Sequence, residues 1–199
     1  MVKKYLSRTY AFLVYLFLYM PIFLLILFSF NDSRYGGRWQ GFTFKWYTEL
    51  FSDGSIMESL YTTIIVAVIA SIISTVIGTI SAIAIHNMSP RKKAILTNLS
   101  YIPMVNPDIV IGISLLSFFS ILNLKLGYIT LILAHITFNI PYVIFAVLPK
   151  LQQLNPNIEE AALDLGATPI QAFFKVILPE IMPGIITGSL LAFTLSLDD

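Results

Sequence analysis

Long apolar blocks, separated by shorter polar stretches, run along the whole chain. A helix needs about 20 consecutive apolar residues to cross the hydrocarbon core of a bilayer. Blocks of this kind cover residues 10–30, 60–85, 95–122 and 128–148, and a fifth begins near residue 183 and is still running at residue 199. The pattern predicts an all-α integral membrane protein, a multi-span helical bundle whose five spans form a single transmembrane domain over residues 1–199.

Composition agrees with this class and excludes several kinds of chemistry. Hydrophobic residues fill 57% of the 199 positions and charged residues 12%, whereas soluble domains carry about 25% charged residues. The chain has no cysteine, which excludes disulfides, thiolate metal sites and a cysteine nucleophile. The formal net charge of +1 gives no reason to expect a nucleic-acid partner.

Motifs for catalysis and nucleotide binding are absent from the sequence. It contains no HExxH, no GxSxG and no phosphate loop of the Gly-x4-Gly-Lys-Ser/Thr type. Its two histidines, His86 and His135, are far apart and lack a second ligand at helical spacing, so we expect no metal site. We therefore expect no catalytic residue and no cofactor bound to this chain itself.

The basic residues are distributed unevenly between the polar stretches. Eight of the twelve Lys and Arg residues lie in the N-terminal tail, in the link of residues 86–94 and in the segment of residues 149–182. Because cytoplasmic loops are enriched in Lys and Arg, we expect the N-terminus and both segments in the cytoplasm, and residues 31–59 outside. The first apolar block follows three basic residues, as the core of a signal peptide does. It is longer than such a core, which has about 7–15 residues, so we expect an uncleaved span.

Small residues form one face of the second block. Ser74, Gly78 and Ala82 follow one another at four-residue spacing. Such a face lets two helix backbones approach closely. We favour packing within this chain; the alternative is a contact with a second subunit.

The polar segment of residues 155–181 begins like a short surface helix. Ile158–Leu165 is amphipathic, and Gly166 after it suits a helix end, where glycine readily takes the left-handed conformation. Ala161 and Ala162 leave a shallow surface without bulky side chains. From the residues alone, a surface on which a partner docks and an ordinary interfacial loop are equally good interpretations.

A second short helix is expected in the same segment. Ile170–Ile177 follows Thr168, a plausible N-cap, and Pro169, at the first helical position where proline is favoured. Pro179 and Pro183 are expected to separate this helix from the fifth span.

The segment also carries a motif. It reads Glu160-Ala161-Ala162, then Gly166 after three residues, then Val176-Ile177-Leu178-Pro179 after nine more. This spacing resembles the EAA motif of the permease subunits of binding-protein-dependent ABC importers, with Val176 in place of the usual Ile as the only departure. The resemblance implies a coupling segment that seats in a groove of a nucleotide-binding subunit, with the contact carried by Glu160, Ala161, Ala162, Gly166, Leu178 and Pro179.

The resemblance covers essentially the whole chain. Within the family, the resemblance is to the polyamine branch, the importers of spermidine and putrescine. It rests on Trp39-x-Gly41-Phe42-Thr43-x-x-Trp46-Tyr47, on Pro107-Asp108-Ile109-Val110 followed by Gly112-Ile113-Ser114, and on Phe193-Thr194-Leu195-Ser196-Leu197-Asp198-Asp199. It implies a multi-pass permease in a bacterial inner membrane, with a homologous second permease, two ATPase subunits that bind ATP and Mg, an extracytoplasmic solute-binding protein and a polyamine substrate. Such subunits normally have six spans, so we expect a fragment that stops before the sixth.

Asp108 is the first candidate for contact with a substrate. It lies about 13 residues into the third block, or about 20 Å along one helix. An acid at such depth costs about 2.5–3.5 kcal/mol and usually faces a bundle interior or an aqueous path. Pro103, Asn106 and Pro107 are expected to break the helix beside it, as in many transporter sites. A structural acid paired with Asn106 or His135 is the alternative.

Asp198, Asp199 and Trp46 complete the expected substrate path. Two adjacent carboxylates cannot both stay charged in a low-dielectric site without a nearby cation, and a polyamine is a linear polycation. The alternative places both acids near the external surface, already solvated. Aromatic faces attract ammonium groups by about 0.5–2 kcal/mol, although an interfacial belt of Trp39, Trp46 and Tyr47 is the commoner arrangement.

Three rival functions fit parts of the sequence. An ion-coupled carrier would use Asp108 as its ion site, but it has no use for a docking segment. An intramembrane enzyme would need a nucleophile–base pair or a metal constellation, and the sequence contains neither. The same kind of importer could carry another solute, but deep acids without a deep Lys or Arg argue against anions.

Overall fold

The apolar blocks fold into long helices, as their length predicts. The computed structural model describes residues 2–34 and 37–198. In this part of the chain, helical runs long and apolar enough to cross a membrane lie in α1 (Val2–Phe28), α3 (Gly54–His86), α6 (Tyr128–Gln153) and residues 169–198, which end in α9 (Leu178–Asp198). The prediction of an all-α, multi-span membrane protein is confirmed.

The chain divides into two units, of which the first covers residues 1–60. Here a loop joins α1 to the short helix α2 (Lys45–Ser52). The loop closes around the buried side chain of Asn31. This side chain donates from Nδ2 to the carbonyl of Arg38 at 2.8 Å and accepts from the backbone N–H of Gln40 at 2.7 Å. One buried amide therefore holds the backbone of Arg38 and Gln40 beside Asn31.

The third apolar block is bent, and it forms two helices. Helix α4 (Pro90–Val105) ends before Asn106, helix α5 (Asp108–Ile121) begins after Pro107, and the two helices meet at 104°. The residue before a proline is driven out of the helical region, and Asn106 accordingly has an extended ψ of 146°. The expected break at Asn106 and Pro107 is confirmed, whereas Pro103 lies inside α4.

The bend changes the position of Asp108. The depth of about 20 Å assumed one straight helix through the third block. That assumption is wrong because Asp108 begins a new helix in a different direction. Its distance from either membrane surface therefore does not follow from its place in the sequence.

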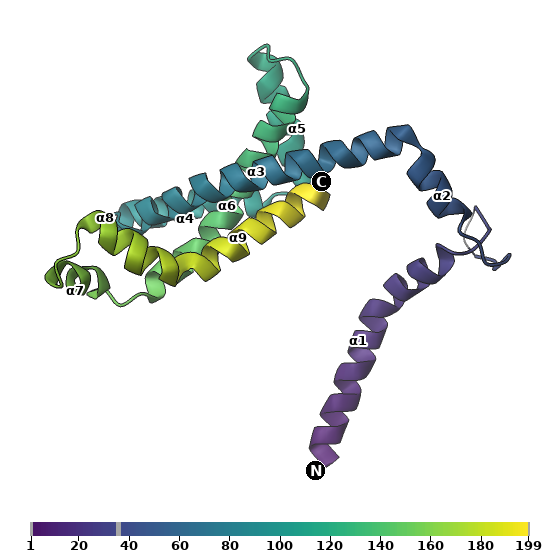
Figure 1. Cartoon of the computed structure of the whole chain (residues 1–199), viewed down its shortest axis with the longest axis horizontal. Coiled ribbons are helices and arrows are strands. Elements are labelled where there is room, and N and C mark those ends of the chain that lie inside the picture. Colours follow the sequence, from purple (N-terminus) through teal and green to yellow (C-terminus); the bar gives the residue numbers. More distant parts are fainter. Residues whose placement is uncertain (1, 35–36, 199) are drawn as a thin grey trace. The chain divides into compact units, whose positions relative to one another are not determined.

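The second unit, residues 61–199, is built around α6, with α3 and α9 packed against it (Figure 1). Both neighbours turn buried small residues toward it at four-residue spacing: Ser74, Gly78 and Ala82 on α3, and Gly184, Gly188 and Ala192 on α9. A Cβ built on Gly78 would lie 2.6 Å from Cβ of Val143, and one on Gly188 would lie 3.1 Å from Cα of Val143. The expectation that the small face of α3 packs within this chain is confirmed.

The coupling segment, residues 155–181, leads into α9 without interruption. It contains α7 (Ile158–Asp164), α8 (Pro169–Ala172) and a π-helical turn (Phe173–Ile177) that continues into α9. Figure 1 shows α7 and α8 at the opposite end of α9 from the C-terminus. The second short helix and the last span are thus one helical run from residue 169 to residue 198.

The expected separation at Pro179 and Pro183 is therefore wrong. In the π turn, the N–H of Leu178 donates to the carbonyl of Phe173, five residues back. This wider turn ends just before Pro179, which has no N–H to continue the α-helical pattern. Pro183 lies inside α9, as membrane helices tolerate when neighbouring groups satisfy the backbone.

Candidate substrate pocket and coupling segment

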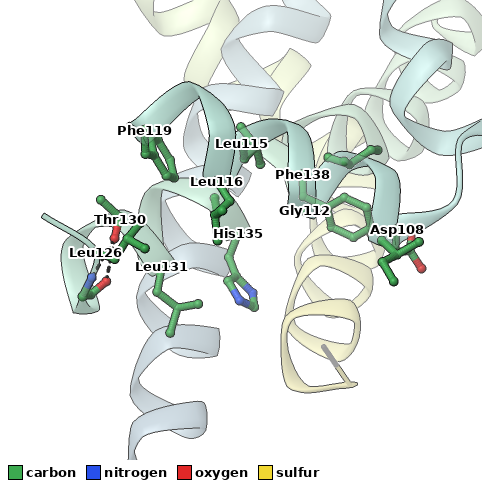
Figure 2. Close-up of a pocket in the computed structure, with 14 residues that line it drawn as sticks. Asp108, Gly112, Leu115, Leu116, Phe119, Leu126, Thr130, Leu131, His135 and Phe138 are labelled. Carbon is green, nitrogen blue, oxygen red and sulfur yellow. Dashed lines mark hydrogen bonds between the residues drawn. The ribbon is translucent and has the colours of Figure 1, made fainter. Parts of the chain in front are cut away.

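A pocket of about 600 Å³ lies between α5 and α6. Figure 2 shows Asp108 at one end of the labelled side chains and Thr130 at the other, with His135 between them. The remaining wall is mainly apolar and includes Leu115, Leu116, Phe119, Leu131 and Phe138. Such a pocket suits a solute with an apolar body and a cationic group.

Asp108 is the carboxylate of this pocket. It occupies the first turn of α5, directly after the N-cap residue Pro107, and its side chain is exposed. The N–H groups at a helix start stabilise a negative charge by about 0.3–1 kcal/mol. Asn106, one expected alternative partner, instead donates from Nδ2 to the carbonyl of Ile102 at 2.8 Å. Asp108 can therefore present its carboxylate to a cation in the pocket.

His135 joins the pocket wall to α9. Its Nδ1 lies 2.6 Å from Oγ of Ser196, a hydrogen bond between residues 61 positions apart in the sequence. Ser196 is buried, and which of the two atoms donates depends on the imidazole tautomer. A displacement of α9 therefore acts directly on a residue that lines the pocket.

The other expected substrate residues lie elsewhere. Asp198 is exposed at the end of α9 and is not among the described residues that line the pocket. Asp199 lies outside the described residues. In the first unit, the ring N–H of Trp46 donates to the carbonyl of Asn31 at 2.8 Å, and the ammonium of Lys45 lies 5.3 Å from a ring centroid of Trp46. Trp46 thus already attracts a cation of its own chain.

Gly166 ends α7 as expected. Its φ of 85° lies in the left-handed region. The N–H of Gly166 donates to the carbonyl of Leu163 at 2.8 Å, and the N–H of Ala167 donates to the carbonyl of Ala162 at 3.1 Å. These two bonds form the Schellman motif that glycine permits.

Thr168 begins the next helical run, also as expected. Its hydroxyl accepts from the N–H of Gln171 at 3.3 Å, and the side chain of Gln171 accepts from the N–H of Thr168 at 3.1 Å. This reciprocal pair is a capping box, and Pro169 follows at the first helical position.

The exposed surface of the coupling segment differs from the expected one. Glu160 and Ala161 are exposed, but Ala162 is buried at 8% exposure, so the expectation that both alanines form a shallow surface is wrong for Ala162. Of the two residues at the end of the motif, Leu178 packs against the core and Pro179 is exposed. Large apolar side chains are exposed around the Gly166 turn instead: Leu165, Ile170 and Phe174 at 90%, 71% and 60%.

Comparison with known proteins identifies the family. The profile of the family described as "Binding-protein-dependent transport system inner membrane component" matches residues 74–199, which contain the pocket, the coupling segment and α9. The chain belongs to this family. The expected membership among binding-protein-dependent importer permeases is thereby confirmed, and the chain is a multi-pass inner-membrane component of a transport system.

Relatives of this permease are similar along all or most of its length. The spermidine/putrescine transport system permease protein PotC of Haemophilus influenzae is 38% identical over 199 residues, covering 100% of this chain and 77% of the relative. PotC of Escherichia coli K12 is 39% identical, with 100% and 75% covered. The putrescine transport system permease protein PotI of the same strain is 40% identical over 190 residues, with 92% and 68% covered.

Three features of the permease escaped the sequence reasoning. The Ser196–His135 bond joins residues that are distant in the sequence, and no feature of the sequence near either residue predicts it. The apolar residues around the Gly166 turn could have been found from their helical positions. The small-residue ridge of α9 had a clear signal, since its four-residue spacing is the same as that of the face recognised on α3.

Proposed function

We propose that this chain is the permease subunit of an ATP-driven polyamine importer, with its N-terminus in the cytoplasm. It pairs with a homologous second permease and works with an extracytoplasmic solute-binding protein and two ATPase subunits, which bind ATP and Mg. No cofactor binds to this chain. The polyamine assignment is supported by the spermidine and putrescine systems to which the relatives belong.

One observation carries the proposal. The helical run that starts at Thr168 in the coupling segment extends without a break through α9 to Ser196, which is hydrogen-bonded to His135 in the pocket wall. A motor that displaces the coupling segment therefore acts on the pocket wall through this one helical run, from Thr168 through α9, which we call the rod. An ion-coupled carrier has no use for such a connection.

The chemistry of the pocket fits a polyamine. Asp108 offers a carboxylate to one ammonium group, and the apolar walls of α5 and α6 can cover the methylene segments between the charges. The imidazole of His135 adds a polar group farther along the pocket. Weak, spaced contacts of this kind allow a solute to enter and also to leave.

The exposed surface of the coupling segment fits a protein groove. Leu165 and Ile170 flank the Gly166 turn and are largely exposed, and the acids Glu159, Glu160 and Asp164 lie on α7 beside them. Buried apolar anchors with charged residues around them are typical of protein interfaces. An ATPase groove with an apolar floor and basic rim would complement this surface.

The test is polyamine uptake by the complete assembly in liposomes. In the variant Asp108→Asn, assembly and basal ATP hydrolysis should stay normal. Uptake of labelled spermidine or putrescine should fall about ten- to a hundredfold, since a charge-assisted hydrogen bond contributes about 1.5–3 kcal/mol. Unchanged uptake kinetics in this variant would remove Asp108 from the path.

A matched control removes a carboxylate outside the pocket. Asp53 accepts a hydrogen bond from the backbone N–H of Ser55 at the start of α3, and asparagine can replace it in this capping role. Asp53→Asn should therefore transport normally. Uptake that continues after ATP is depleted, with ion gradients held constant, would contradict the ATP-driven mechanism itself.

A further inference from the structure

A four-residue repeat runs along both helices of the α6–α9 contact. On α9, the buried small residues at this spacing are Gly184, Gly188, Ala192 and Ser196. On α6, His135, Asn139, Val143 and Val147 follow one another at the same spacing, and His135, Val143 and Val147 contact α9. Each step of four residues is about one helical turn, or 5.4–6 Å along the axis.

The observed register pairs these two rows in opposite directions. Ser196 is bonded to His135 at one end. A Cβ on Gly188 would meet Cα of Val143 at 3.1 Å. One turn further, a Cβ on Gly184 would meet the carbonyl oxygen of Ala146 at 2.8 Å and Cα of Val147 at 3.3 Å. The spacing then places Ala192 at the level of Asn139.

Asn139 is left without a partner in this register. Its side chain is fully buried, and neither its amide nitrogen nor its amide oxygen has a hydrogen-bond partner among the described residues. A buried amide without a partner is costly, and more so in a membrane protein, where no bulk water surrounds the helices. Ala192, at the same level, has no side-chain group that could bond to it.

We propose that α9 has a second register along α6, displaced by one turn toward the coupling segment, in which Ser196 bonds to Asn139. Ala192 then faces Val143, and Gly188 faces Val147. The proposal rests on the proposed function in one respect: ATP-driven movement of the coupling segment supplies the pull on α9. Asn139 is thus a positioning residue for transport, which acts through Ser196 and not on the solute.

The contact surface permits such a step. Between residues 184 and 196, the buried residues of α9 are small and present no large side chain to α6. The step replaces Val143 by Val147 opposite Gly188, and these two residues are of the same type and both fully buried. The serine hydroxyl keeps one hydrogen bond in either register. One-turn displacements of one packed element past another are a known form of switching between discrete states.

The first experiment measures the register directly in the complete assembly. The chain has no cysteine, so nitroxide labels can be placed on Ile129→Cys in α6 and Leu190→Cys in α9, both at exposed positions. Between the nucleotide-free and the hydrolysis-arrested, ATP-bound states, the inter-label distance should lengthen by about 5 Å. The matched control pair, Ile129→Cys with Ile72→Cys in α3, should keep its distance.

The outcomes separate this inference from the proposed function. A wild-type assembly that imports polyamine while the first pair keeps one distance in every nucleotide state overturns the register shift alone. Nucleotide-dependent lengthening supports the shift, even in an assembly that takes up no polyamine, which would overturn the substrate assignment instead. Equal lengthening in both label pairs shows a different motion and also overturns the shift.

The second experiment tests Asn139 with two substitutions of nearly equal size. Asn139→Ala removes the partner for Ser196, whereas Asn139→Ser keeps a hydroxyl there. Because Asn139 makes no hydrogen bond in the observed register, both variants should melt at the same temperature. The maximal uptake rate should be roughly three- to tenfold lower for alanine than for serine, with unchanged KM. Equal maximal rates for the two variants would overturn the role of Asn139.

Discussion

Helix α6 has two very different neighbours in α9 and α5. Against α9 it makes a contact so close that a Cβ on Gly184 would meet the carbonyl oxygen of Ala146 at 2.8 Å. Against α5 it leaves a pocket of about 600 Å³. One helix is therefore both a partner of a tightly packed rod and a wall of an open cavity.

The difference has its origin in residue size and in the bend at Pro107. Glycine and alanine on α9 bring the backbones together. Helix α5 presents large residues such as Leu115 and Phe119, and the 104° bend turns it away from the direction of α4. The close contact with α9 and the cavity beside α5 are thus two different surfaces of α6, and the contrast between them can be tested.

The largest effect is expected from a valine placed in the tight contact. Gly184→Val would press its side chain against the backbone of Ala146, which cannot rotate away as a flexible side chain can. The variant should lose about 3 kcal/mol of stability, at the upper end of the usual overpacking cost. Thermal unfolding of the detergent-solubilised protein measures this loss.

The same change on the open side is the matched control. A Cβ on Gly112 of α5 would meet nothing within 4 Å, and valine has a slightly better helix propensity than glycine. Gly112→Val should therefore leave the melting temperature nearly unchanged. If the two variants melted at the same temperature, the contrast between the two sides of α6 would not hold.

Local chemistry explains which parts of this architecture the sequence could predict. The helices follow from the length of the apolar blocks. The turn at Gly166 follows from the conformational freedom of glycine, and the cap at Thr168 follows from its hydroxyl. Each of these signals lies within a few residues of the feature that it predicts, so one sequence suffices.

The features that the sequence did not predict depend on residues farther away along the chain. The residues around Pro107 predict a break, but they do not predict the 104° angle between α4 and α5. Pro179 reads as a helix end, yet the π turn before it lets the helix continue. The bond from His135 to Ser196 requires α6 and α9 to be antiparallel neighbours in one particular register, and spacing along one chain cannot fix that register.

A smaller effect is expected at the turn that shapes the coupling segment. Gly166 has a φ of 85° and open space around it, so strain alone limits substitution. Gly166→Val should cost about 1–2 kcal/mol and should uncouple ATP hydrolysis from polyamine uptake while membrane insertion stays normal. Asparagine tolerates the left-handed region better, so Gly166→Asn should retain more coupling. A normal substrate-stimulated ATPase rate in the valine variant would show that the rod is not driven from this end.

The smallest effect is expected at the first residue of the rod. Thr168→Ala removes the hydroxyl that accepts from the N–H of Gln171 and should cost about 1 kcal/mol at the start of α8. Thr168→Ser keeps the cap and serves as the control. Because the loss is local, amide hydrogen exchange should quicken in α8 and the π turn but not where α9 packs closely on α6. Faster exchange along the whole of α9 would mean that α9 is stabilised by its N-terminal cap and not by its contact with α6. That result would contradict the view that the close contact with α6 makes α9 rigid.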